Sequence, residues 1–303
     1  MLETNLAGIK LKNPTVLVSG ILGVTGQSMA RAAKGGAAAV TMKSVGPKPW
    51  LGYHNPTVVA NEHFMLNAVG LPSPGYKNNE AEWNGLGELQ KKDVRVFASL
   101  YAWTLEEMEE IAESIAARKP DLIEIDLSCP HMKEAGEFAF NPEQAAAAVS
   151  AVKGKAGKVP VSPKLSPNTN RMVEIAKACE EAGADGISAI NTVGGMAIDI
   201  EMRKPVLANK TGGISGPAIK PVAIKAVYQL YDALKIPVLG MGGCTNGRDA
   251  IEFIQAGASA VGIGTAVYYR GIDVFSKVCL EMQQWMKENS VKSVKELVGA
   301  AHE

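Results

Sequence analysis

The feature that most constrains the fold of this chain is a short segment that recurs along it. Each copy reads as the end of a helix, a turn with glycine and a strand of small apolar residues, and the copies lie at 34–40, 181–187 and 255–261. Glycine suits the left-handed residue that follows the last turn of a helix. A joint of this kind, repeated at intervals, indicates repeating helix–strand units. The repeat therefore predicts an alternation of helices and strands.

Short apolar runs extend this pattern to the rest of the chain. Runs without polar alternation indicate strands that are buried on both faces. Eight such runs lie at 15–18, 38–42, 94–100, 122–126, 161–164, 187–191, 238–240 and 260–263. Helices are predicted between most of them, at 104–118, from 141–142 onward, and at 170–182, 221–234 and 247–256. Eight strand–helix units favour an α/β fold that closes into a TIM (β/α)8 barrel, a single domain over 1–303.

Three connections of the predicted barrel are much longer than the others. They are 44–93, 127–141 and 192–220, and each follows a predicted strand. The loops that follow the strands lie at the C-terminal face, where barrel enzymes place their active sites. We therefore expect the functional residues in and around these three loops.

Composition and charge exclude several classes of function. Lys and Arg total 31 and so do Asp and Glu, so the chain has no net charge that would attract nucleic acid or an anionic membrane. The four cysteines include no CxxC pair and the sequence has no histidine cluster, so we predict no metal site and no iron–sulfur cluster. The N-terminus has no basic region that leads into a long apolar stretch. We expect a cytoplasmic enzyme with reduced thiols and no membrane anchor.

Glycine-rich loops follow the last three predicted strands. They lie at 211–216, 240–243 and 262–265. Either of the last two alone is explained equally well by a tight turn between a strand and a helix. Together they occupy the position where barrels bind phosphate, and glycines leave backbone N–H groups open to an anion. The loops therefore predict a phosphate group in the ligand.

Polar side chains stand where predicted strands end. Lys43 and Lys164 would be desolvated in a barrel mouth unless an anion meets them, although a lysine exposed at the end of a strand is the simpler alternative. A flavin fits, because its reduced ring carries a negative charge that an ammonium stabilises. Asn67, Asn191 and Thr192 add donors and acceptors that suit a flat ring with amide groups, although loop asparagines often only form turns.

Cys129 is the candidate reactive residue. A lone cysteine in an apolar segment is more often an inert core residue, which is how we interpret Cys179 and Cys279. Cys129, however, follows a predicted strand directly and opens a long loop before Pro130. A thiol with its ordinary pKa of about 8.5 can abstract a proton near neutral pH when it is shielded from water. We therefore predict that Cys129 acts as a base.

These residues and motifs resemble the catalytic subunit of the dihydroorotate dehydrogenase family over essentially the whole chain. The most specific stretches are 189–192, 195–199, 203–209 and 211–217. The resemblance is closest to the class whose catalytic subunit pairs with an FAD-containing and iron–sulfur electron-transfer subunit, which passes electrons from FMN to NAD. It implies a cofactor, FMN, and a heterotetramer built on a homodimer core. The quinone-linked class has a membrane-associated N-terminal extension and usually a serine base, so it is disfavoured.

The resemblance also implies roles for individual residues. Cys129 would remove the C5 proton of dihydroorotate while the C6 hydride passes to FMN. The pyrimidine and its carboxylate would contact Lys43, Asn67, Val69, Gly70, Leu71, Asp126, His131, Asn191 and Thr192. FMN would be held by Ser19, Gly20, Lys43, Ser44, Lys164, Asn191, Gly216, Gly242, Gly243, Gly264 and Thr265, the last four around its phosphate.

The chain departs from the family pattern at two positions. Where the family normally has asparagines on either side of the Leu-Ser-Cys-Pro motif, this chain has Asp126 and His131. An ionised Asp126 can only accept hydrogen bonds and would place a negative charge near the orotate carboxylate. Our hypothesis is that Asp126 and His131 form a pair across the loop.

Other functions remain compatible with the sequence. An alternative substrate is another dihydropyrimidine or cyclic amide, such as dihydrouracil. A different class is a non-redox phosphate-binding barrel, either an aldolase with Lys164 as Schiff base or a barrel that serves only subunit contact. Fumarate could replace the NAD-linked partner as electron acceptor.

Overall fold

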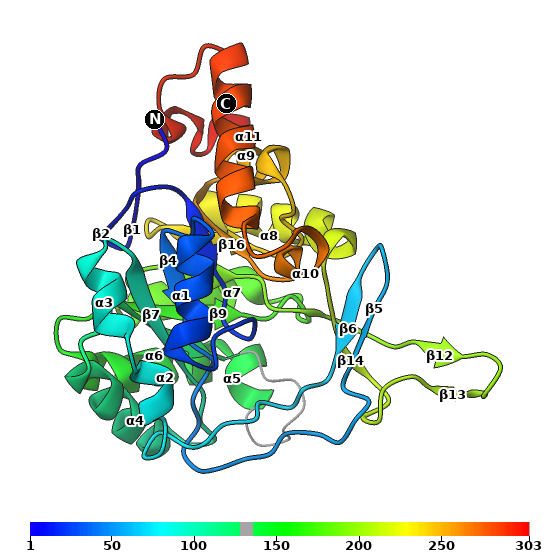
Figure 1. The fold of residues 1–303 in the computed structure, drawn as a ribbon. Helices are drawn as coiled ribbons and strands as arrows, with labels where there is room; N and C mark the ends of the chain where they lie inside the picture. Colours follow the sequence, from blue (N-terminus) through cyan, green and yellow to red (C-terminus); the bar gives the residue numbers. More distant parts are fainter. Residues whose placement is uncertain (128–135, 303) are drawn as a thin grey trace.

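The centre of the protein is a closed barrel of parallel strands (Figure 1). The computed structural model describes residues 1–127 and 136–302. In order around the ring, the strands are β3 (Thr15–Leu17), β4 (Ala39–Thr41), β7 (Arg95–Leu100), β8 (Leu122–Asp126), β9 (Val161–Leu165), β10 (Ile187–Ala189), β15 (Val238–Met241) and β16 (Ala258–Ile263). Each pairs in parallel with both neighbours, and β16 closes the ring on β3. The predicted TIM barrel is confirmed, and each predicted strand matches one of these.

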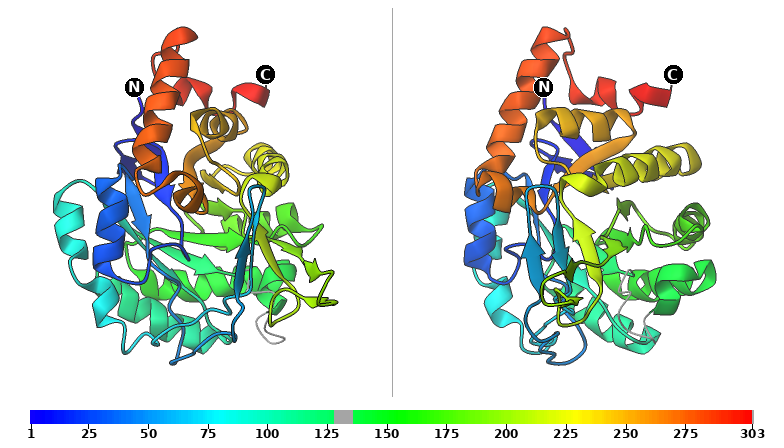
Figure 2. Two further views of the ribbon diagram at one scale, coloured as in Figure 1. Left: turned by 45° about the vertical axis from the view of Figure 1, so that its right-hand side comes forward. Right: turned by 90° about the vertical axis from the view of Figure 1, so that its right-hand side faces the viewer.

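Helices surround the barrel on its outside (Figure 2). The longer ones are α1 (Gly26–Lys34), α3 (Leu86–Lys91), α4 (Leu105–Ala117), α6 (Pro142–Ala156), α7 (Met172–Glu181), α8 (Lys220–Ala233), α9 (Gly247–Gln255) and α11 (Val274–Glu288). The shorter ones are α2 (Glu80–Trp83), α5 (Gly136–Phe140), α10 (Ala266–Arg270) and the 3-10 turns η1 (Pro217–Ile219), η2 (Val294–Leu297) and η3 (Ala300–His302). The predicted capping box is present, since the Thr104 hydroxyl accepts from Glu107 N at 3.2 Å.

The repeated helix–strand joint has the backbone that the sequence predicts. Gly36, Gly183 and Gly257 have φ angles of +107°, +94° and +114°, a region that residues with a side chain rarely adopt. At each of these glycines the chain leaves a helix and enters the next barrel strand within a few residues. Because these joints are short, each of these helices stays close to the barrel and packs on its outside.

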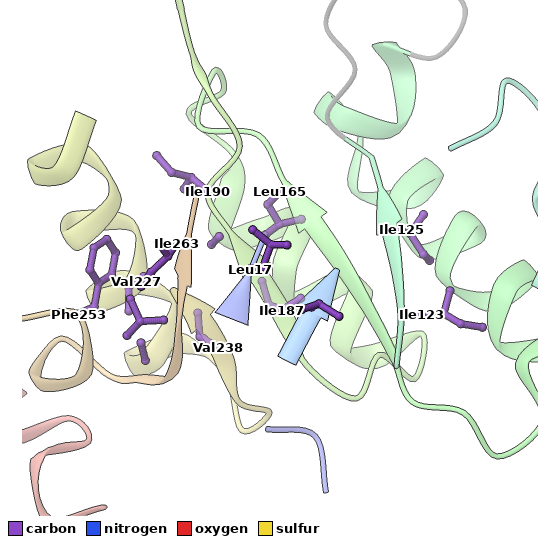
Figure 3. Close-up of a cluster of buried hydrophobic side chains, with 14 of the residues drawn as sticks. Leu17, Ile123, Ile125, Leu165, Ile187, Ile190, Val227, Val238, Phe253 and Ile263 are labelled. Carbon is purple, nitrogen blue, oxygen red and sulfur yellow. The ribbon is translucent and has the colours of Figure 1, made fainter. Parts of the chain in front are cut away.

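The hydrophobic core lies on both faces of the barrel wall. On the outer face, Leu165 and Ile187 of the strands and Val227 and Phe253 of the helices belong to one buried cluster (Figure 3). Gly240 of β15 makes this contact close, because a Cβ there would lie 2.8 Å from Phe253 Cδ1. Apolar side chains thus fill the layer between strands and helices, as the non-alternating runs predict.

The N-terminal end of the barrel is closed by a hairpin. Strands β1 (Thr4–Leu6) and β2 (Ile9–Leu11) pair in antiparallel fashion. Their buried residues Leu6 and Leu11 pack with Val16, Phe97 and Leu239 of the barrel strands. The hairpin lies at the opposite side of the barrel from the antiparallel strands described next (Figure 1). Ligands therefore enter at the C-terminal end.

The long connections 44–93 and 192–220 are not plain loops. They contain β5 (Val58–Ala60), β6 (Met65–Asn67), β11 (Val193–Gly195) and β14 (Gly212–Ser215), which form one antiparallel sheet in the order β11-β14-β6-β5. The pair β12 (Ile198–Asp199) and β13 (Lys204–Pro205) extends away from the barrel (Figure 1). These strands are not predicted from the sequence. Strand β10 also ends at Ala189, two residues before the predicted limit at Asn191.

Candidate active site

A cavity of about 310 Å³ opens at the C-terminal end of the barrel, below the antiparallel sheet. Seventeen residues that the sequence analysis assigned to substrate or flavin all line this cavity. They are Ser19, Gly20, Lys43, Ser44, Asn67, Val69, Gly70, Leu71, Asp126, Lys164, Asn191, Thr192, Gly216, Gly242, Gly243, Gly264 and Thr265. The other two, Cys129 and His131, lie outside the described residues. The structure thus brings together every predicted residue that it describes.

The sheet β11-β14-β6-β5 forms the roof of this cavity. Asn67 ends β6 and faces Gly213 of β14 in register, and Asn67 Nδ2 donates to Gly213 O at 3.3 Å. The chain then turns through Gly70, with φ of +77°, to Leu71. The carbonyl oxygen of Leu71 accepts a hydrogen bond of 2.9 Å from the Tyr101 hydroxyl. Pairing of the sheet and this hydrogen bond fix the side of the cavity that would face a substrate.

Glycines form one end of the cavity. Gly216, Gly242 and Gly243 have φ angles of +93°, +122° and +87°. A Cβ on Gly243 would lie 2.7 Å from the carbonyl oxygen of Gly216, so neither the backbone angle nor the space tolerates a side chain. Gly264 adds a fourth glycine, since a Cβ there would lie 2.9 Å from Val18 Cγ2. The loops that follow β14, β15 and β16 therefore bring exposed backbone together at this end of the cavity.

Tyr269 provides an unpartnered polar atom at the same end. Its hydroxyl oxygen is buried and has no hydrogen-bond partner among the described residues. It lies 3.4 Å from the position that a Cβ on Gly216 would occupy. Buried polar groups normally have a partner, so this hydroxyl fits a ligand oxygen next to the glycines. The glycines and Tyr269 together suit a phosphate group.

A buried group of charges forms the floor of the cavity. Lys164 Nζ donates to Glu124 Oε1 at 3.0 Å and lies 3.3 Å from Asp126 Oδ2. The three side chains are 3% to 7% exposed. Burial by itself would lower the pKa of Lys164, but Asp126 and Glu124 act in the opposite direction and the net effect raises it. Lys164 is therefore held as an ammonium ion.

Hydrogen bonds continue from this group around the barrel interior. Ser99 Oγ donates to Glu124 Oε1 at 3.3 Å, and the hydroxyls of Ser99 and Ser44 lie 2.8 Å apart. Ser44 in turn lies 3.1 Å from the hydroxyl of Ser19. On the other side, Asn191 Nδ2 donates to Asp126 Oδ1 at 3.4 Å. Polar side chains from six barrel strands and the loops that follow them are thereby linked at the floor of the cavity.

Lys43 is the second cation of the cavity. It follows β4, and its backbone N donates to Gly23 O at 2.9 Å. Glu82 of α2 is buried behind this region, and burial raises the pKa of its carboxyl to about 7 although the positive charge of Lys43 lowers it. Lys43 therefore lies in the cavity wall, where its ammonium group could pair with an anionic group of a ligand.

The charge of Lys164 argues against the Schiff-base alternative. An amine must be neutral to attack a carbonyl carbon, and such lysines have a lowered pKa. The pKa of Lys164 is raised instead, because two buried carboxylates stabilise its ammonium form. An aldolase that uses this lysine is therefore disfavoured.

Several residues of the site were not identified from the sequence. Ile190, Ile219 and Met241 give the cavity apolar walls, and apolar residues at strand ends carry no signal that separates them from core. Glu124 was also missed, although alternation along a strand places it on the same face as Asp126. Among the described residues, no group of three or more His, Cys, Asp or Glu could hold a metal ion.

Comparison with known proteins identifies the family. The model of the family described as dihydroorotate dehydrogenase matches residues 1–286. A relative from Methanocaldococcus jannaschii, named dihydroorotate dehydrogenase B (NAD(+)), catalytic subunit, is 50% identical and covers 100% of this chain and 99% of its own length. Relatives of the same name from Pyrococcus abyssi and Methanosarcina mazei are 46% and 45% identical, with 99% and 98% of this chain covered and 99% and 94% of theirs. The resemblance seen in the sequence is confirmed, and the chain belongs to the dihydroorotate dehydrogenase family.

Proposed function

We propose that this chain, over 1–303, is an FMN-binding domain that oxidises dihydroorotate to orotate in pyrimidine biosynthesis. The observation that carries the proposal is the cavity at the C-terminal end of the barrel. It combines a glycine-rich end, the buried ammonium of Lys164 and the Asn67 amide of the roof in a member of this family. Its relatives are named for this reaction. Membership of the family implies a flavin, and FMN is the form with a single phosphate that the glycine-rich end fits.

The residues present fit FMN in three respects. Gly216, Gly242, Gly243, Gly264 and Thr265 would surround the phosphate with backbone N–H groups. Lys164 would face the flavin ring, where its ammonium stabilises the negative charge of the reduced form. Ser19, Gly20 and Ser44 would contact the remaining part of the ring and its side chain. When bound, the flavin supplies a hydride acceptor.

The substrate would lie between the flavin and the roof. Lys43 would pair with the carboxylate, and Asn67, Asn191 and Thr192 would hydrogen-bond to the polar groups of the pyrimidine. The turn at Val69, Gly70 and Leu71 would close one edge. Cys129 would remove the C5 proton and His131 would contact the pyrimidine; both roles rest on the sequence alone.

The relatives' name also bears on partners. A catalytic subunit of the NAD-linked class implies a partner electron-transfer subunit. We propose that this partner carries FAD and an iron–sulfur cluster, that two catalytic chains form a homodimer core of a heterotetramer, and that the complex is cytoplasmic. In the described part of the chain, no helix is both long and apolar enough to span a membrane.

Anaerobic flavin bleaching tests the proposal. Adding dihydroorotate to the flavin-loaded protein should remove the absorbance near about 450 nm that oxidised flavins show. Cys129→Ser should slow the bleaching by a factor of about 10²–10⁴, the usual contribution of a general base. Cys279→Ser, which removes a thiol from α11 away from the cavity, is the matched control and should bleach at the wild-type rate. A protein that takes up no flavin, or that is bleached only by dihydrouracil, would refute the proposal.

A further inference from the structure

Two buried carboxylates lie beside one ammonium group below the cavity. Glu124 and Asp126 lie two residues apart on β8, so their side chains share the interior face of the barrel. Lys164 lies on the neighbouring strand β9, and its Cα is the direct partner of Asp126 in the parallel register. One ammonium is thus placed between two carboxylates.

Each of the two carboxylates also accepts from a neutral donor. The Ser99 hydroxyl donates to Glu124 at 3.3 Å, and the Asn191 amide donates to Asp126 at 3.4 Å. Asp126 and Lys164 form an ion pair at 3.3 Å in a barrel interior, where charges are weakly screened.

The two carboxylates differ in what they face. Asp126 and Lys164 both line the cavity, whereas Glu124 lies beneath it. A flavin bound in this cavity would therefore lie near both the Lys164 ammonium and the Asp126 carboxylate. Negative charge on the reduced ring would be stabilised by Lys164 and opposed by Asp126.

We propose that Asp126 is a positioning residue that fixes Lys164 and lowers the reduction potential of the bound flavin. The proposal rests on the proposed flavin site, but it concerns a property that bleaching by substrate does not measure. A lower potential makes the reduced flavin a stronger electron donor, which suits transfer to an acceptor of low potential. Glu124 contributes in the same direction from a greater depth.

The test is the reduction potential of the flavin in Asp126→Asn. The purified flavin-loaded variant and wild type would be titrated with reductant against a reference dye. Asparagine keeps the size of the side chain and removes its charge. For a unit charge in the same cavity at an effective dielectric constant of about 20, the reduction equilibrium should shift at least about tenfold toward the reduced form. Tenfold corresponds to about 30 mV for a two-electron couple.

Three further variants separate charge from shape. Asp126→Glu keeps the charge and should restore a potential close to that of wild type. Glu124→Gln should raise the flavin reduction potential by less than Asp126→Asn does. If Asp126→Asn does not fold, the direction of the shift in Glu124→Gln tests whether a buried carboxylate lowers the potential, and a shift to a lower potential would refute it. Asp185→Asn is the matched control. Asp185 pairs with Lys153 at 2.7 Å and accepts a hydrogen bond from Val161 N, which lies at the end of β9 away from the cavity. It should leave the potential unchanged.

Two outcomes would overturn the inference in different ways. If Asp126→Asn binds flavin and its potential equals or falls below that of wild type, Asp126 does not act on the flavin through its charge, and the proposed function stands. If the wild-type chain takes up no flavin, the proposed function fails together with this inference.

Discussion

Replacing Lys164 with methionine tests how much the buried charges contribute to stability. Lys164 Nζ lies 3.0 Å from Glu124 Oε1 and 3.3 Å from Asp126 Oδ2, and all three side chains are at most 7% exposed. Methionine retains most of the apolar stem but no charge, so two carboxylates would remain in the barrel without their cation. Removing one partner of a buried ion pair costs about 3–5 kcal/mol. We expect Lys164→Met to lower the free energy of unfolding by that amount at pH 7.

Urea denaturation followed by circular dichroism measures this loss, and the chain offers a matched control. Lys153 pairs with Asp185 at a shorter distance, 2.7 Å, but the two side chains are 30% and 35% exposed. Water screens such a pair, so Lys153→Met should cost about 1 kcal/mol or less. Equal losses in the two variants would refute the reasoning that burial, rather than distance, sets the contribution of each pair.

The pH dependence of the same difference follows from the raised pKa of Lys164. A group whose folded pKa lies above its unfolded value of 10.5 contributes its full stabilisation below that value and loses it as pH rises through the folded value. The difference between wild type and Lys164→Met should therefore stay constant from pH 7 to 9. It should shrink toward about pH 4, since carboxylates without a cation take up protons. A difference that grows in acid would contradict this account.

Three further predictions concern other parts of the molecule. Gly243→Ala should destabilise the protein by about 1–3 kcal/mol more than Gly85→Ala in thermal melts, since both have positive φ but only Gly243 lacks space for a Cβ. Burial raises the pKa of Glu82 to about 7, so stability should fall as pH rises from 4.5 to about 7, and Glu82→Gln should abolish that fall in pH-dependent denaturation. Brief iodoacetamide treatment at pH 8 with mass spectrometry should label Cys129 and spare Cys179, whose pKa burial raises to about 12; equal labelling would contradict this.

The barrel could be predicted from the sequence because its signals are local. Three of the helix–strand joints turn through a glycine with positive φ, namely Gly36, Gly183 and Gly257. Each barrel strand is buried on both faces, which leaves an apolar run in the sequence. These requirements act within a few residues of the chain, so they could be read without knowledge of the tertiary contacts.

The antiparallel sheet over the cavity could not be predicted in this way. Its strands β5, β6, β11 and β14 have three or four residues each, and β11 and β14 consist largely of glycine and small residues. Their pairing is set by contacts between distant parts of the chain, such as Asn67 with Gly213. Short strands of this composition have the sequence character of loops.

The ligand-facing residues were predictable as a set, but their charge pairing was not. Parallel strands bring their carboxyl ends to one face, so Lys43, Asp126 and Lys164 had to lie near one another. Which charges touch is decided by register, and β8 and β9 place Asp126 opposite Lys164. The carboxylate of Asp126, which by sequence alone would place a negative charge near the orotate carboxylate, therefore pairs with Lys164. The hypothesis of a pair between Asp126 and His131 is not tested, because His131 lies outside the described residues. Lys164 is shared between Asp126 and Glu124. We therefore propose that Lys43 is the cation that meets an anionic substrate, and that the charge of Asp126 acts mainly on the flavin.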